Sequence, residues 1–129
     1  KQITSMSVLI MDDDEIVRSS MQLMLEDCGH QVTSTKHGEE CLKAYEKGLN
    51  EKKYFDVIIL DLTISGGKGG IWTLEKILKL HPSARAIAAS GYSHDNTLSN
   101  YKQIGFLAVL QKPFGIETLN KCLEDVINM

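Results

Sequence analysis

Asp56-Val57-Ile58-Ile59-Leu60-Asp61-Leu62 is the stretch of this sequence that decides the fold. Four consecutive apolar residues end abruptly on an acid, which is the pattern of a parallel strand buried on both faces. A second stretch, Ser7-Val8-Leu9-Ile10-Met11, has the same character and runs into Asp12, Asp13 and Asp14. The two stretches predict a parallel sheet with acidic groups at its carboxyl edge.

Helices and strands alternate along the rest of the chain. Apolar residues at helical spacing, with capping residues and glycines at the ends, predict helices over 14–28, 38–48, 71–80, 95–104 and from Gly115 onward. Short apolar or β-branched runs predict further strands over 31–35, 84–89 and 106–110. Strict alternation predicts a flavodoxin-like (βα)5 doubly wound sheet with strand order 2-1-3-4-5.

Length and composition are those of one domain, expected over 1–129 with a core at about 7–127. The chain has 129 residues and 43% hydrophobic content, which is enough for a single core. A net charge of −3 predicts no direct contact with nucleic acid or an anionic membrane surface. The longest apolar runs are far shorter than the ~20 residues of a membrane span.

The cysteines and histidines suggest neither a disulfide framework nor a zinc site. Three cysteines, an odd number, lie far apart without a CxxC pair, which indicates a reducing, cytoplasmic compartment. The histidines have no second ligand at metal-binding spacing and are expected in loops or at the surface. The residues concerned are Cys28, Cys41 and Cys122, and His30, His37, His81 and His94.

Acids from two distant stretches are expected to share one pocket. With strand order 2-1-3-4-5 the strands before Asp12 and Asp61 are neighbours, so Asp12, Asp13 and Asp61 converge. Like charges this close repel, and a bound cation resolves the repulsion. Mg²⁺ is the natural candidate because it uses one or two carboxylates, water and phosphate oxygens, and Mn²⁺ is expected to substitute.

The same edge of the sheet carries the groups that phosphoryl transfer needs. Asp61 can act as a nucleophile toward phosphorus if Mg²⁺ and Lys112 offset the incoming charge. Ser90 can donate its hydroxyl to a phosphoryl oxygen, and N–H groups after Asp61, beginning with Leu62, and at Gly91 can complete an anion cradle.

Taken singly, these residues have simpler interpretations. Asp14 is best interpreted as a helix cap, a Lys-Pro pair usually marks a turn, and an isolated serine is usually a solvated hydroxyl. The glycines at 66–70 lack the spacing of a nucleotide-binding phosphate loop and favour a flexible helix start. Met21, Met24 and Tyr45 are expected in the core.

As a set, the residues resemble the receiver domains of two-component signalling over nearly the whole chain. The resemblance lies in segments 8–14 and 56–62, in Ser90-Gly91 and in Lys112-Pro113-Phe114. It implies that Asp61 is the phosphoacceptor and that Asp12, Asp13 and the Thr63 backbone carbonyl hold the metal. It also implies phosphoryl contacts from Ser90 and Lys112 and a cis Lys112-Pro113 bond.

Three positions depart from the usual receiver pattern. Ser65 stands where receivers commonly have proline, and the glycines after it predict a mobile loop. Val109 replaces the usual aromatic switch residue three positions before the lysine. Tyr92 lies close enough to Ser90 in sequence to gate access to the acceptor, although an exposed loop tyrosine is the simpler interpretation.

The resemblance further implies a partner and an output. The phosphoryl donor is expected to be a histidine kinase or a histidine phosphotransfer domain, and the domain would catalyse its own phosphorylation and dephosphorylation without turning over a metabolite. The helix at 95–104, the strand at 106–110 and the last helix form the family's usual homodimer or partner face.

The context of the domain has two interpretations. The chain is either a stand-alone regulator or part of a hybrid sensor kinase, which could be tethered to a membrane in its full length. The segment Asp61-Leu62-Thr63-Ile64 and a start at Lys1 favour the hybrid kinase.

Other function classes compete with a phosphoacceptor. An aspartate-nucleophile phosphatase would need an acid two residues after Asp61, where this chain has Thr63. An FMN-binding protein of the same topology and a phosphorylation-independent interaction module remain alternatives, because this fold serves many functions.

Overall fold

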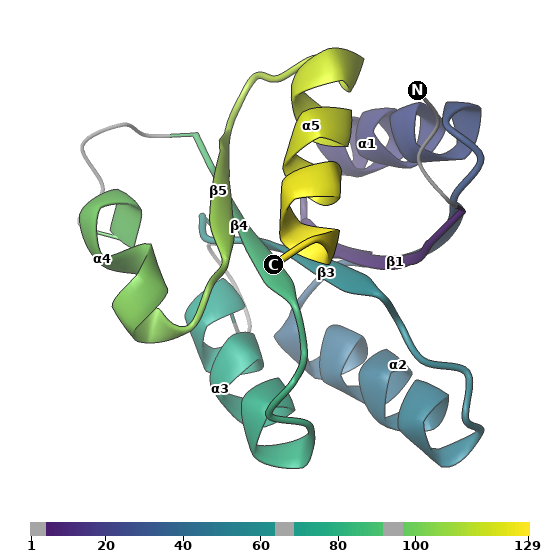
Figure 1. Cartoon of the computed structure of the whole chain (residues 1–129), viewed down its shortest axis with the longest axis vertical. Coiled ribbons are helices and arrows are strands. Elements are labelled where there is room, and N and C mark those ends of the chain that lie inside the picture. Colours follow the sequence, from purple (N-terminus) through teal and green to yellow (C-terminus); the bar gives the residue numbers. More distant parts are fainter. Residues whose placement is uncertain (1–4, 64–68, 92–96) are drawn as a thin grey trace.

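The computed structural model describes residues 5–63, 69–91 and 97–129, in which five strands alternate with five helices (Figure 1). The strands are β1 (Ser7–Met11), β2 (Gln31–Thr35), β3 (Val57–Asp61), β4 (Ala86–Ser90) and β5 (Ala108–Gln111). The helices are α1 (Glu15–Asp27), α2 (Gly38–Asn50), α3 (Gly70–Leu80), α4 (Thr97–Ile104) and α5 (Ile116–Ile127).

The sheet is parallel throughout, in the order β2-β1-β3-β4-β5, which confirms the predicted topology. Side chains alternate between its two faces, as the period of a strand requires. Even-numbered residues of β1, such as Ile10, pack with α1 and α5, whereas Leu9 and Met11 pack with α2 and α3. Figure 1 shows α1 and α5 on one side of the sheet and α2 and α3 on the other.

Several predicted boundaries shift by a few residues. The fifth strand was expected over 106–110 but spans Ala108–Gln111, because the Phe106 N–H donates to the Tyr101 carbonyl in the turn after α4. The fourth strand begins at Ala86, since Ala84 closes a turn onto His81. Helix α2 continues past Gly48 to Asn50. The two strands begin late because a turn hydrogen bond precedes each of them.

The core contains the three residues that the sequence analysis placed there. Met21 and Tyr45 are buried, and Met24 packs against the core. On α1, the apolar side chains of Ile16 and Leu23 are 78% and 63% exposed. All three cysteines are free. Among the described residues, no helix combines the length and apolarity that a membrane crossing requires.

His30 lies in the loop between α1 and β2, in agreement with the prediction that the histidines occupy loops or the surface. This residue is buried, and its Nδ1 accepts a hydrogen bond of 3.0 Å from the Met6 N–H at the entry to β1. His81 is half-buried and its Nδ1 lies 2.6 Å from the Tyr45 hydroxyl. His94 lies outside the described residues. A histidine that accepts from a buried backbone N–H acts as a neutral structural group.

We expect the neutral His30 ring to make stability depend on pH. Burial lowers the pKa of His30 below its ordinary value of 6.5, although the Asp56 carboxylate opposes the shift. The unfolded chain therefore binds a proton that the folded protein resists, and the free energy of unfolding decreases as the pH falls below about 6.5. Urea unfolding at pH 7.5 and pH 5.5 measures the loss.

His30→Asn provides the matched control. The amide oxygen replaces Nδ1 as an acceptor for the Met6 N–H but does not titrate over this range. The variant should lose less stability than the wild type between the two pH values, whatever its stability at pH 7.5. An equal loss in both proteins would show that other groups cause the pH dependence.

Candidate functional site

The carboxyl ends of four strands bring the predicted residues together. Asp12 directly follows β1, Asp61 ends β3, and Ser90 ends β4. Lys112 directly follows β5, and its N–H donates to the Ser90 carbonyl over 2.8 Å. Residues 12 and 112, a hundred positions apart in sequence, therefore meet because the sheet places both strand ends at one edge.

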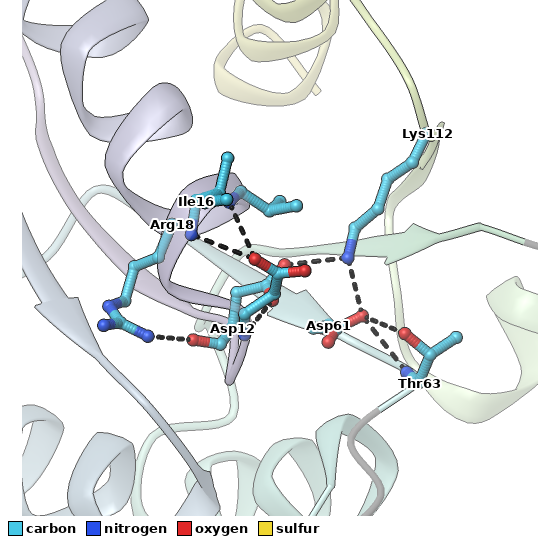
Figure 2. Close-up of polar contacts among 8 residues, drawn as sticks. Asp12, Ile16, Arg18, Asp61, Thr63 and Lys112 are labelled. Atoms are coloured by element: carbon cyan, nitrogen blue, oxygen red, sulfur yellow. Dashed lines mark hydrogen bonds and ion pairs between the residues drawn. The ribbon is translucent and has the colours of Figure 1, made fainter.

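Asp12 is held at every polar atom. Its N–H donates to the Thr35 carbonyl, its Oδ1 accepts from the Asp14 N–H at 2.9 Å, and its Oδ2 accepts from Lys112 Nζ at 2.7 Å. The Arg18 guanidinium donates to its carbonyl oxygen over 2.8 Å (Figure 2). With 0% exposure, Asp12 is a fully buried acid whose position is set by both backbone and side-chain partners.

One carboxylate oxygen of Asp61, Oδ1, accepts three hydrogen bonds. Its Oδ1 accepts from the Thr63 N–H at 3.1 Å, from the Thr63 hydroxyl at 2.8 Å and from Lys112 Nζ at 3.0 Å (Figure 2). Within the described part of the chain, Oδ2 receives no hydrogen bond. Asp61 is 1% exposed. The described contacts thus fix the carboxylate through Oδ1 alone.

Lys112 offsets part of the charge of the two buried acids. Its side chain is 17% exposed and bridges Asp12 and Asp61 (Figure 2). Burial raises the pKa of Asp12, and the Lys112 hydrogen bond only partly offsets this. Burial by itself lowers the pKa of Lys112, but the hydrogen bonds to both carboxylates and the attraction of their charges together outweigh it, and the net pKa is raised. The pocket therefore holds two acids against a single ammonium group.

Asp13 adds a third carboxylate that fits a divalent cation. One ligand oxygen from each of Asp12, Asp13 and Asp61 lies within 4.8 Å of the others. Asp13 is exposed, whereas the other two acids are buried, so a cation here would have protein on one side and water on the other. Such an all-oxygen set open to solvent suits a hard ion that retains part of its hydration shell.

Most of the other predicted residues also lie at this edge of the sheet. Ser90 is buried, Gly91 is exposed, and the Lys112-Pro113 peptide is cis, as expected. The Leu62 N–H, predicted as part of an anion cradle, donates to the Ala89 carbonyl. Tyr92 and Ser65 lie outside the described residues.

Two further predictions concern residues beside the pocket. The Asp14 carboxylate accepts from the N–H groups of Ile16 and Val17, so it is the N-cap of α1. Val109, in the position of the usual aromatic switch, is half-buried beside α4 residues in the core.

Arg18 is a site residue that sequence reasoning missed. It lies in the first turns of α1, and its guanidinium reaches back to the Asp12 carbonyl. The contact anchors the loop that carries Asp12 and Asp13 and brings positive charge near the acids. The sequence shows only one arginine a few residues after the acids. Its spacing does not distinguish it from a charged residue on the exposed face of a helix.

Comparison with known proteins agrees with the resemblance to receiver domains. The family model for the response regulator receiver domain matches residues 8–124. The response regulator GacA of Pseudomonas aeruginosa is 28% identical over 121 residues, which cover 92% of this chain and 54% of that protein. The chain spans between about a quarter and a half of the curated relatives it matches.

Solved structures agree on the fold. A receiver domain protein from Clostridium thermocellum has a TM-score of 0.85 at 23% identity, covering 95% of this chain and 94% of that one. The receiver domain of a sensor histidine kinase from Pseudomonas aeruginosa has a TM-score of 0.82 at 20% identity, covering 98% and 100%. That structure has a magnesium ion coordinated in its active site cleft.

Lys112→Met should destabilise the protein without added metal. The substitution preserves much of the side-chain volume but leaves two buried carboxylates unpaired, and we expect the free energy of unfolding at pH 7 to fall by about 3 kcal/mol. Urea unfolding in the presence of a chelator measures the loss.

Lys121→Met is the matched control, because Lys121 pairs with Asp125 at 2.9 Å on the exposed face of α5. Exposed pairs contribute little, so this variant should unfold like the wild type. If the two variants lost equal stability, the balance of buried charges would not be what makes Lys112 important for folding.

Proposed function

The chain belongs to the response regulator receiver domain family, and we propose that in it Asp61 accepts a phosphoryl group from a phosphohistidine donor. Phosphorylation on an aspartate is general for this family. The position of Asp61 supports its role as the acceptor. It is a buried acid at the end of β3, and its Oδ1 lies 3.0 Å from Nζ of Lys112, the only lysine that contacts these acids among the described residues. Asp12 also accepts a hydrogen bond from Lys112, but both of its carboxylate oxygens have donors, so it is the less suitable acceptor.

The two oxygens of Asp61 have different tasks in this proposal. Oδ1 is held by Thr63 and Lys112, so Oδ2 is the oxygen that attacks phosphorus. A P–O bond forms to Oδ2 as the P–N bond of the donor breaks, and the electron pair stays on the imidazole nitrogen. Lys112 then offsets charge on the transferred group, and the Ser90 hydroxyl donates to a phosphoryl oxygen.

Asp12, Asp13, Asp61 and the Thr63 carbonyl would hold Mg²⁺, for which Mn²⁺ would substitute. The oxygen cluster of the three acids and the magnesium ion in the Pseudomonas receiver support this assignment. When bound, the ion would neutralise charge on the phosphoryl oxygens and on the carboxylates. Asp12 and Asp13 contribute by placing two carboxylates beside the acceptor.

Receiver domains are phosphorylated by histidine kinases. For this chain the donor is a histidine kinase or a histidine phosphotransfer domain, and the domain catalyses its own phosphorylation and dephosphorylation. The output is a conformational change that a partner reads, with α4, β5 and α5 as the candidate homodimer or partner face. Val109 indicates a switch that does not depend on an aromatic residue at that position.

Asp61→Asn should abolish phosphorylation. With acetyl phosphate and Mg²⁺, we expect intact-protein mass spectrometry to find one added phosphoryl group on the wild type and none on the variant, because an amide lacks the nucleophilic oxygen. Asp56→Asn is the control, since Asp56 stands at the opposite end of the same strand and accepts from the Ser7 N–H. Equal labelling of Asp61→Asn and the wild type would exclude Asp61 as the acceptor.

Phosphorylation should also require the metal. Chelation with EDTA is expected to stop labelling, and Asp13→Asn should raise the Mg²⁺ concentration needed for half-maximal rate by roughly tenfold, since it removes one charged ligand. Initial rates across a Mg²⁺ titration measure this. Glu15→Gln, two residues further along and outside the acid cluster, should follow the wild-type curve; an unshifted Asp13→Asn curve would remove Asp13 from the metal site.

A further inference from the structure

Gly70, the first residue of α3, packs directly against the backbone of Asp61. A Cβ placed on Gly70 would lie 2.8 Å from the Asp61 carbonyl oxygen, 3.0 Å from Leu62 Cδ2 and 3.4 Å from the Asp61 carbonyl carbon. Carbon atoms do not approach a carbonyl oxygen this closely in folded proteins, so any other residue at position 70 requires a movement. Gly70 is buried.

Neither side of this contact can retreat easily. The Asp61 backbone is clamped in the sheet, where Asp61 pairs with Ala89 and the Leu62 N–H donates to the Ala89 carbonyl over 2.9 Å. On α3, the buried Thr73 hydroxyl donates to the Gly69 carbonyl over 2.7 Å, and Leu74 lies in the core. Two rigid elements therefore meet at the backbone of the acceptor.

We propose that Gly70 is a positioning residue for the phosphoryl-transfer site. Its missing side chain lets α3 approach the acceptor, and this close approach sets where the Asp61 carbonyl, and with it the side chain, stands relative to Lys112 and Thr63. The inference rests on the proposed role of Asp61. A displacement of about 1 Å at a reacting group can reduce a rate by roughly a hundredfold.

Two other glycines provide matched controls. A Cβ on Gly69 would meet nothing within 4 Å, although the residue is the immediate neighbour of Gly70. A Cβ on Gly48 would lie 2.7 Å from the Lys53 carbonyl oxygen, which is the same kind of conflict in α2 and the turn that follows it. Gly69→Ala therefore tests the local sequence change, and Gly48→Ala tests a backbone conflict that does not involve Asp61.

The experiment measures stability and phosphorylation in the three alanine variants. Urea unfolding gives the folded fraction, and labelling by acetyl phosphate with saturating Mg²⁺ gives the maximal rate per folded molecule. We expect Gly70→Ala to slow labelling at least tenfold, Gly48→Ala to lose stability at an unchanged rate, and Gly69→Ala to label at the wild-type rate. A Gly70→Ala rate equal to that of Gly48→Ala would overturn the proposal.

A second readout does not depend on phosphorylation. The Thr63 N–H donates to Asp61 Oδ1, so its amide resonance should move in Gly70→Ala and stay in place in Gly48→Ala. If the wild type were not labelled at all, the proposed function would be wrong, and this resonance alone would decide whether Gly70 positions Asp61. An unmoved Thr63 resonance in Gly70→Ala would overturn the proposal independently.

A second variant tests the proposal if Gly70→Ala does not fold. Leu62→Ala/Gly70→Ala removes the 3.0 Å contact with Leu62 and retains the conflict with the Asp61 carbonyl. Compared with Leu62→Ala alone, the double variant should label at least tenfold more slowly. Equal rates in the two proteins would show that Gly70 does not position the acceptor.

Discussion

One ammonium group shared by two buried carboxylates is the interaction on which the site depends. Asp12 and Asp61 sit at the ends of neighbouring strands with almost no contact with water, where like charges repel strongly. Lys112 comes from a third strand and lies 2.7 Å from one acid and 3.0 Å from the other. The site still holds more negative than positive charge, an excess that the proposed Mg²⁺ would neutralise.

The surroundings of the acids limit their freedom. Asp12 is bound through its N–H, its carbonyl and both side-chain oxygens, with Arg18 holding the carbonyl from α1. Asp61 is bound through Oδ1, and Gly70 packs against its backbone. A preorganised site needs little rearrangement when charge arrives, which is what the proposed transfer to Asp61 requires. Asp13, by contrast, is exposed to solvent.

Sequence reasoning succeeded where a residue's position follows from its own segment. The apolar run before Asp61 could only be a buried strand, and the N-cap role of Asp14 follows from its place before a helix. It was less accurate where a contact from elsewhere decides the outcome. The sequence placed His30 in a loop but did not predict its burial or its hydrogen bond with Met6, and β5 begins later than expected because Phe106 turns back toward α4.

The sequence by itself determined the alternation of strands and helices, and hence the sheet whose carboxyl edge collects Asp12, Asp61, Ser90 and Lys112. That information is local, since apolar periodicity and capping residues act within a few positions. Only the tertiary structure decided which oxygen of Asp61 is held, that Arg18 anchors Asp12, and that Gly70 touches the acceptor backbone. These contacts join residues from different elements at distances of a few ångströms, and packing, which no single segment encodes, sets them.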